Sequence, residues 1–184
     1  MKKGTCYIVG AGDFTPCQLK PQPGDLLIAA DGGYDSLKLH GVKPDLLLGD
    51  MDSLSSIPRH IPRMVFPKKK NDTDVSLAIK VGIKKGYSHF ALYGISGDRP
   101  DHFYANMQLM VNFARQGFSM RAVLPEGVVY ALHQGMMMIS APPQTTISLF
   151  CPEGTAEGVF TEGLLYPLKN ATLTSDFPLG VSNE

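Results

Sequence analysis

A run of three leucines, Leu46–Leu48, is followed by a glycine and then by two aspartates with one residue between them, Asp50 and Asp52. A continuous apolar run of this length is typical of a strand buried on both faces of a parallel sheet. Gly49 allows the backbone to turn at the end of that strand. The two carboxylates are then able to face one point, as ligands of a hard divalent cation do. The alternative is an ordinary polar turn, and this pair alone does not decide between them.

Acids follow three other predicted strands in the same way. They are Asp31 after residues 26–30, Asp72 and Asp74 after residues 64–66, and Asp98 and Asp101 after residues 90–93. The carboxyl ends of parallel strands joined by right-handed crossovers lie along one edge of the sheet. So many like charges would repel one another unless cations neutralise them. A divalent metal with a polyphosphate satisfies this condition, and Lys70 and Arg99 are then natural partners for the phosphate oxygens.

Segments with helical periodicity alternate with the predicted strands. Three segments show it, each followed by a glycine, at residues 34–40, 75–83 and 103–114. Thr73 precedes the middle segment, where a helix cap is as good an interpretation of this residue as a role in a site. Alternating strands and helices predict an α/β fold, with a Rossmann-like domain built on a parallel sheet.

The pattern changes after Pro125, where helical periodicity stops. Glycine, proline and asparagine separate six short strand-like runs, at residues 127–132, 136–139, 145–150, 158–160, 164–168 and 171–174. This spacing predicts a small antiparallel sandwich or barrel. We therefore expect an α/β domain at residues 1–124 and an all-β domain at residues 125–184.

The composition limits which classes of binding partner and which cellular compartment are expected. Lys plus Arg and Asp plus Glu both number 17, so the net charge is zero and no general attraction to nucleic acid or membrane is expected. The three cysteines lack Cys-x-x-Cys spacing, which argues against a disulfide framework and a zinc site and predicts a reduced, cytoplasmic protein. The apolar stretch Cys6–Val9 is shorter than a signal-peptide core of about 7 to 15 residues. No stretch approaches the roughly 20 apolar residues of a membrane span.

The ordered motifs closely resemble those of the bacterial thiamine pyrophosphokinases. The matching residues cover almost the whole chain: Asp31–Gly33, Pro44–Ser53, Lys70, Thr73, Asp74, Gly94–Gly97, Arg99, Asp101, His102, Asn106, Gly163–Leu168, Leu173 and Gly180–Glu184. The resemblance implies an ATP-binding catalytic α/β domain followed by a thiamine-binding β domain. It also implies an enzyme, a thiamine diphosphokinase, that transfers pyrophosphate from ATP to the thiamine hydroxyl and releases AMP.

The resemblance assigns roles to individual residues. The expected ligands of the cofactor Mg²⁺ are Asp31, Asp50, Asp52 and Asp74. The expected nucleotide-binding residues are Lys70 and Arg99 on the phosphates, with Gly32, Thr73, His102 and Asn106 around them. His102 is equally consistent with a hydrogen bonder at a helix start. Asp101 is expected to orient or deprotonate the thiamine hydroxyl, and Ser182 and Asn183 are expected to recognise thiamine.

The sequence departs from the family pattern at two places. Asn71 stands where the family often has an acid, so it is not assigned to the metal. Family chains continue beyond the motif Ser182–Glu184, so the β domain is expected to lack its last strand. The resemblance further implies a homodimer, in which the thiamine pocket lies between the β domain of one subunit and the α/β domain of its partner.

Two other functions stay open at this point. The apolar strand followed by Asp50 and Asp52 also resembles the nucleophile motif of haloacid dehalogenase-type phosphatases, although that motif normally sits on the first strand and two predicted strands precede it here. The non-enzymatic alternative is a homologue that binds thiamine or a nucleotide and has weak or no turnover. Metal-dependent AMP formation would identify the transferase, and a covalent aspartyl phosphate would identify the phosphatase.

Overall fold

The computed structural model describes residues 2–51, 58, 60–67 and 72–184 of the chain. The chain forms two compact units that divide between Gly135 and Met136. The first unit is an α/β structure and the second is rich in β-strands, as the sequence predicts.

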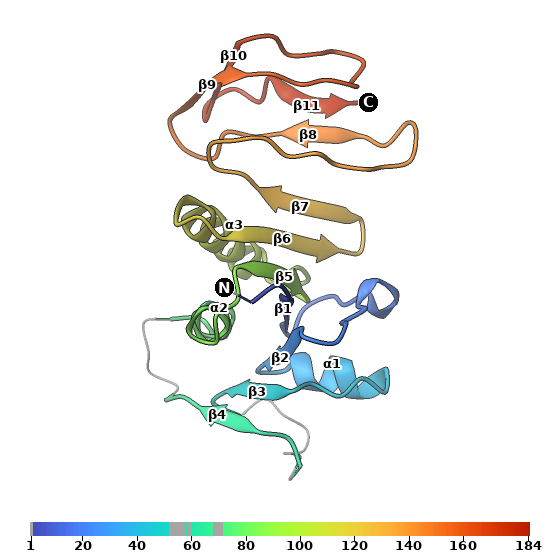
Figure 1. Cartoon of the computed structure of the whole chain (residues 1–184), viewed down its shortest axis with the longest axis vertical. Coiled ribbons are helices and arrows are strands. Elements are labelled where there is room, and N and C mark those ends of the chain that lie inside the picture. The colour runs from blue at the N-terminus through green and yellow to red at the C-terminus, as the bar shows by residue number, and fades with distance from the viewer. Residues whose placement is uncertain (1, 52–57, 59, 68–71) are drawn as a thin grey trace. The chain divides into compact units, whose positions relative to one another are not determined.

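The first unit is built on a seven-stranded sheet with the order β4-β3-β2-β1-β5-β6-β7 (Figure 1). Its strands are β1 (Thr5–Val9), β2 (Leu26–Ala30), β3 (Leu46–Gly49), β4 (Arg63–Val65), β5 (His89–Tyr93), β6 (Ser119–Leu124) and β7 (Gly127–Ala131). Every neighbouring pair is parallel except β6 with β7. The chain adds β2, β3 and β4 outward on one side of β1 and then returns to add β5 on the other side. The strand order therefore reverses between β1 and β5.

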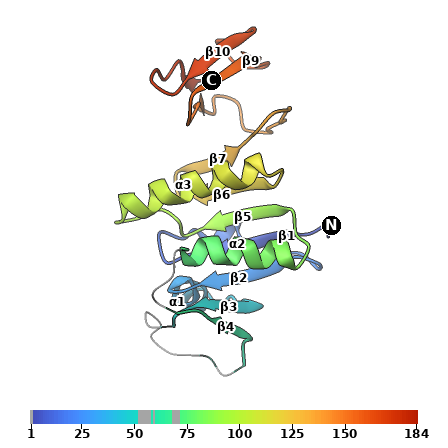
Figure 2. The ribbon, with the colours of Figure 1, turned by 90° about the vertical axis from the view of Figure 1, so that its left-hand side faces the viewer.

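Helices cover both faces of this sheet. In the described part of the chain they are α1 (Gly33–Leu39), α2 (Asp74–Lys84) and α3 (Pro100–Arg115), with a short 3₁₀ helix, η1 (Pro16–Gln18). Figure 2 shows α2 and α3 on one face, and Figure 1 shows α1 on the opposite face. None of these described helices is both long enough and apolar enough to cross a membrane.

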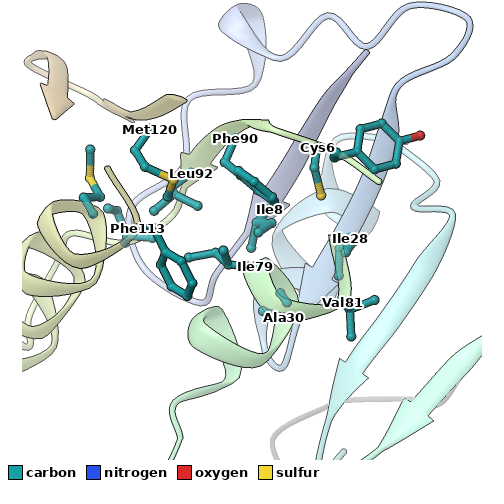
Figure 3. Close-up of a cluster of buried hydrophobic side chains, with 14 of the residues drawn as sticks. Cys6, Ile8, Ile28, Ala30, Ile79, Val81, Phe90, Leu92, Phe113 and Met120 are labelled. Carbon is teal, nitrogen blue, oxygen red and sulfur yellow. The ribbon is translucent and has the colours of Figure 1, made fainter. Parts of the chain in front are cut away.

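Alternate residues of the strands fill two separate cores, because successive side chains of a strand point to opposite faces. Cys6 and Ile8 of β1 pack with the residues of α2 and α3 (Figure 3). Tyr7 and Val9 pack in the other core, on the side of α1. Leu46–Leu48 also alternate between the two cores and are at most 7% exposed. The prediction that this strand is buried on both faces is confirmed.

The last strand of the sheet, β7, lies beyond the boundary expected at residue 125. Gly127–Ala131 pairs antiparallel with β6, and Leu124 lies opposite Gly127 at the hairpin turn. Val129 and Ala131 pack against the core beneath α3. The segment buries apolar side chains in the first unit, so the division between the units comes after it.

The described strands of the second unit form two small antiparallel pairs. They are β9 (Thr155–Val159) with β10 (Ala171–Thr174), and β8 (Ile147–Leu149) with β11 (Gly180–Asn183). The predicted strands at 136–139 and 164–168 are irregular in the structure. The strand β11 is not predicted, because the Gly-Val-Ser-Asn sequence has little apolar alternation.

We expect truncation of a core leucine to destabilise the first unit strongly. Leu92 is completely buried in β5, so Leu92→Ala should lower the free energy of unfolding by about 2–5 kcal/mol in a urea titration. Leu39, at the end of α1, is 81% exposed and provides a matched control. Leu39→Ala should change the free energy of unfolding by about 0.5 kcal/mol or less. Equal losses in the two variants would contradict the assigned core.

Candidate functional site

The loops that follow β1 and β5 lie side by side at the carboxyl edge of the sheet. In open α/β sheets, ligands bind at this edge where the strand order reverses, which here is between these two strands. Three backbone hydrogen bonds of 2.8 Å join the loops, from the N–H groups of Gly10, Gly12 and Asp13 to the carbonyl oxygens of Tyr93, Gly94 and Ser96 respectively.

Gly10 and Gly94 allow the two loops to approach this closely. A Cβ atom on Gly10 would lie 2.6 Å from the carbonyl oxygen of Gly94. Gly94 also has a φ of 59°, in the left-handed region that favours glycine. The glycines after β1 therefore serve the packing of two loops beneath the edge of the sheet.

Asp31 and Asp50 follow the adjacent strands β2 and β3, and both are partly buried. The N–H of Asp31 donates to the carbonyl oxygen of Leu48 at 2.7 Å. A Cβ atom on Gly49 would lie 3.2 Å from the Cα of Asp31, so the two strand ends are in close contact. The structure thus brings together two of the acids that the sequence places at this edge.

The backbone around these two acids adopts uncommon conformations. Asp31 has a φ of 47° and Met51, directly after Asp50, has a φ of 66°. Left-handed backbone at a residue with a Cβ costs on the order of 1–3 kcal/mol, and such residues cluster at functional sites. Met51 is only 9% exposed, so its buried side chain fixes the turn that follows Asp50.

The residues before α2 mainly organise the start of that helix. The Thr73 hydroxyl accepts a 3.1 Å hydrogen bond from the N–H of Ser76, which confirms the helix-cap interpretation of Thr73. An oxygen of Asp72 accepts from the Ser76 hydroxyl at 2.9 Å and from the Lys80 ammonium at 2.7 Å. Asp74 is the first residue of the helix, where the helix dipole favours a negative charge.

Arg99 and Asp101 form a two-point ion pair at the start of α3. Arg99 donates from Nε to Oδ1 at 3.0 Å and from Nη2 to Oδ2 at 2.6 Å. The hydrogen bond from Arg99 lowers the pKa of Asp101 to about 2 and raises the pKa of Arg99. Both side chains are well exposed. The two residues that the resemblance assigns to different substrates therefore neutralise each other in this structure.

The other two α3 residues expected to bind the nucleotide differ in burial. His102 is exposed. Asn106 is 6% exposed, and its Nδ2 donates to the carbonyl oxygen of Ile95 at 3.2 Å. This bond ties α3 to the loop after β5, so Asn106 holds the loop in place.

Sequence reasoning misses two residues beside these loops. Asp13 is exposed after β1, and the rule that found acids at the other strand ends would also have found this one. The hydroxyl of Ser96 is buried and has no hydrogen-bond partner among the described residues. Ser96 lies within the family motif Gly94–Gly97, but the resemblance assigns no role to its hydroxyl.

Three further residues are expected to bind the metal or the nucleotide, namely Asp52, Lys70 and Gly32. Asp52 and Lys70 lie outside the described residues, and Gly32 is the N-cap of α1. Within the described residues, no three His, Cys, Asp or Glu side chains form a metal cluster. The neighbouring Asp31 and Asp50 nevertheless fit Mg²⁺, because this ion is usually held by one or two carboxylates together with water and substrate phosphates.

The second unit contains the two residues expected to recognise thiamine. Asn183 lines a hollow of about 420 Å³, together with residues 165–168 and 179–181. This volume lies within the roughly 300–1,000 Å³ of small-molecule pockets. Ser182 is exposed, and its N–H donates to the Ser148 hydroxyl at 3.1 Å.

Comparison with known families agrees with this arrangement. Residues 21–122 match the family model described as the catalytic domain of thiamin pyrophosphokinase. The chain belongs to the thiamin pyrophosphokinase family. Residues 137–184 match the vitamin B1 binding domain of the same family, and this match begins next to the division between the two units.

Individual relatives support the family and its fold. The chain is 29% identical to the thiamine pyrophosphokinase of Bacillus subtilis (strain 168) over 167 residues, which cover 86% of this chain and 78% of that protein. A crystal structure of thiamine pyrophosphokinase from Bacillus subtilis has a TM-score of 0.84 at 23% identity and covers 98% of this chain and 89% of its own. The thiamin pyrophosphokinase family protein of Enterococcus faecalis has a TM-score of 0.78 at 21% identity, with coverages of 99% and 89%.

We expect the carboxyl group of Asp101 to report its pairing with Arg99. In Arg99→Gln the charged two-point donor is lost, so the pKa of Asp101 should rise from about 2 towards the ordinary value of about 3.9. An NMR titration of the Asp101 carboxyl carbon measures this pKa directly. Arg63→Gln, on exposed strand β4, should leave the pKa unchanged. A pKa that stays near 2 in Arg99→Gln would contradict the assigned ion pair.

Proposed function

We propose that this chain is a thiamine diphosphokinase, which transfers the pyrophosphoryl group of ATP to the hydroxyl of thiamine and gives AMP and thiamine diphosphate. Membership of the thiamin pyrophosphokinase family supports this activity. The structural observation that carries the proposal is the contact between the ends of β2 and β3, which brings Asp31 beside Asp50. Phosphoryl transfer depends mostly on positioning and on neutralising oxygen charge, and this edge of the sheet offers groups for both.

Asp31 and Asp50 would hold Mg²⁺, with Asp52 and Asp74 as the further ligands proposed from the sequence. When bound, the ion neutralises charge on the phosphate oxygens during transfer. The role of the chain is to hold these carboxylates at one edge before the nucleotide arrives. Lys70 and Arg99 are the proposed cationic partners of the phosphates, and the N-terminus of α2 favours anions at the same edge.

The Arg99–Asp101 pair suggests how nucleotide binding prepares the second substrate. A phosphate group of ATP competes for the same two-point donor on Arg99. When Arg99 turns to the phosphate, Asp101 loses the hydrogen bond that lowers its pKa. A carboxylate with a more ordinary pKa is a better acceptor for the proton of the thiamine hydroxyl. ATP binding would therefore activate Asp101 for its proposed role of orienting or deprotonating that hydroxyl.

The second unit is the proposed thiamine-binding part, and the match of residues 137–184 to the vitamin B1 binding domain supports this. We also propose that the protein is a homodimer whose active site is completed across the subunit interface. The resemblance to the bacterial thiamine pyrophosphokinases supports this assembly.

Product analysis tests the proposed activity. The protein is incubated with ATP, Mg²⁺ and thiamine, and AMP, ADP, inorganic phosphate and thiamine diphosphate are quantified. The proposal predicts AMP and thiamine diphosphate in equal amounts, both dependent on Mg²⁺. Thiamine binding without turnover would support the binding homologue instead, and a covalent aspartyl phosphate would support the phosphatase.

Removal of one charge from the proposed metal site should nearly abolish turnover. Asp50→Asn should lower kcat on the order of 100-fold or more, because it removes a charged ligand worth several kcal/mol of transition-state stabilisation. Asp45→Asn is the matched control. Asp45 lies at the opposite end of β3, where an oxygen accepts from the N–H of Leu27 at 2.8 Å, and an amide oxygen can keep that bond.

The control variant should keep its activity within about twofold of the wild type, because surface and hydrogen-bond-conserving changes away from a site have small effects. Near-normal turnover in Asp50→Asn would exclude the proposed metal role of this residue. Comparable losses in both variants would indicate a general effect on the fold.

A further inference from the structure

Two polar residues, Asp13 and Ser96, lie beside each other where the loops after β1 and β5 meet. Asp13 is exposed, and its carboxylate lies beside Gly97, because a Cβ atom on Gly97 would be 3.5 Å from the Cγ and Oδ1 atoms of Asp13. Ser96 directly precedes Gly97, and its carbonyl oxygen accepts a 2.8 Å hydrogen bond from the N–H of Asp13. The two residues therefore meet at the point where the strand order of the sheet reverses.

The hydroxyl of Ser96 has an unmet hydrogen bond. It is buried, and within the part of the chain that the structure describes it has no hydrogen-bond partner. A buried polar group without a partner costs about 1–3 kcal/mol, so its presence calls for an explanation. Ser96 as a whole is only half-buried. A turn of about 120° about its single side-chain bond moves the hydroxyl to another staggered position, which gives it a route to a ligand without a change of the backbone.

The backbone around these two residues is held in place before any ligand arrives. The N–H of Gly12 donates to the carbonyl oxygen of Gly94 at 2.8 Å, which joins the two loops. The buried Asn106 donates from Nδ2 to the carbonyl oxygen of Ile95 at 3.2 Å, which ties the second loop to α3. A ligand that binds to groups fixed in this way pays a smaller entropic cost.

A carboxylate next to a serine hydroxyl suits a neutral ligand that carries hydroxyl groups. An ionised carboxylate only accepts hydrogen bonds, so Asp13 repels a phosphate but can accept from two adjacent hydroxyls, while the hydroxyl of Ser96 can donate or accept. In dinucleotide-binding α/β sheets, an acidic residue hydrogen-bonds to the ribose in this way. Arg99, the proposed phosphate partner, is three residues after Ser96, which is at most about 11 Å of chain. One nucleotide can therefore span both places.

We propose that Asp13 and Ser96 form the ribose-binding part of the ATP site. Asp13 accepts hydrogen bonds from the two ribose hydroxyls, and Ser96 hydrogen-bonds to one of them. This inference rests on the proposed function, because it places the nucleoside half of ATP at the loops after β1 and β5. The phosphates then extend towards the acids that follow β2 and β3.

Calorimetric titration of the full chain with nucleotides and Mg²⁺, without thiamine, tests this inference. The wild type should bind ATP about tenfold more tightly than 2′-deoxy-ATP or 3′-deoxy-ATP, because each of these lacks one hydroxyl that bonds to a charged group. Asp13→Asn should bind ATP about tenfold less tightly. It should also lose most of the preference for ATP, since the two changes remove the same contact. Asp45→Asn, at the opposite edge of the sheet, should keep the affinity and the preference.

Ser96→Ala should have opposite effects on binding and on stability. It should weaken ATP binding about fivefold, the loss expected for one hydrogen bond between neutral groups. Without nucleotide, its free energy of unfolding should equal or exceed that of the wild type, because the unpaired hydroxyl is removed. This combination excludes a folding defect as the cause of weaker binding. The control is Ser88→Ala, just before β5, where the hydroxyl contacts His89 Nδ1 at 3.1 Å, and it should leave ATP affinity unchanged.

Each failure has a separate signature. Equal affinities of the wild type for ATP and both deoxy forms would overturn the ribose contact while the proposed function stands. An unchanged preference in Asp13→Asn would overturn the role of Asp13, and unchanged ATP affinity in Ser96→Ala would overturn that of Ser96. A ribose preference without thiamine diphosphate in the product analysis would overturn the proposed function alone. Absence of ATP binding by the wild type would overturn both.

Discussion

The burial of β3 on both faces holds the candidate site together. Leu46–Leu48 alternate between the two cores, so this strand is fixed by packing from above and below the sheet. Its end is therefore held against the end of β2, where Leu48 accepts a hydrogen bond from Asp31. The carboxylates of Asp31 and Asp50 would repel each other in isolation, and it is hydrophobic packing that keeps their backbones adjacent. The charge at this edge is thus supported by a strand that has no polar side chains.

Much of the first unit was predictable because its periodicity is strong. The leucine run predicts a strand buried on both faces. The expectation that the acids lie together follows from the rule that the carboxyl ends of parallel strands meet at one edge of the sheet. The position of β7 was harder to predict, because a short β-hairpin strand has the same local pattern in either unit. The pairing of β7 with β6 is decided by tertiary packing of Val129 and Ala131, which no local pattern records.

The candidate site was predictable as a set of residue types but not as a set of contacts. The sequence pattern cannot show that Arg99 forms an ion pair with Asp101. Nor can it show that the side chain of Asn183 hydrogen-bonds to the backbone of Tyr166, because both contacts depend on side-chain geometry. Thr73 illustrates the same limit, since capping and ligand binding require the same hydroxyl at the same position. The strands of the second unit were the least predictable, because few of its side chains are buried and burial is the source of the alternating pattern.

The central claim is that the ends of β2 and β3 form the metal and nucleotide site. Paramagnetic Mn²⁺, added with a non-hydrolysable ATP analogue, broadens the NMR signals of nearby backbone amides and locates the ion directly. The account predicts broadening at Asp31, Asp50 and the loop after β5, with sharp signals at Asp25 and Asp45 on the opposite edge. Broadening at the opposite edge, or none at Asp31 and Asp50, would contradict it.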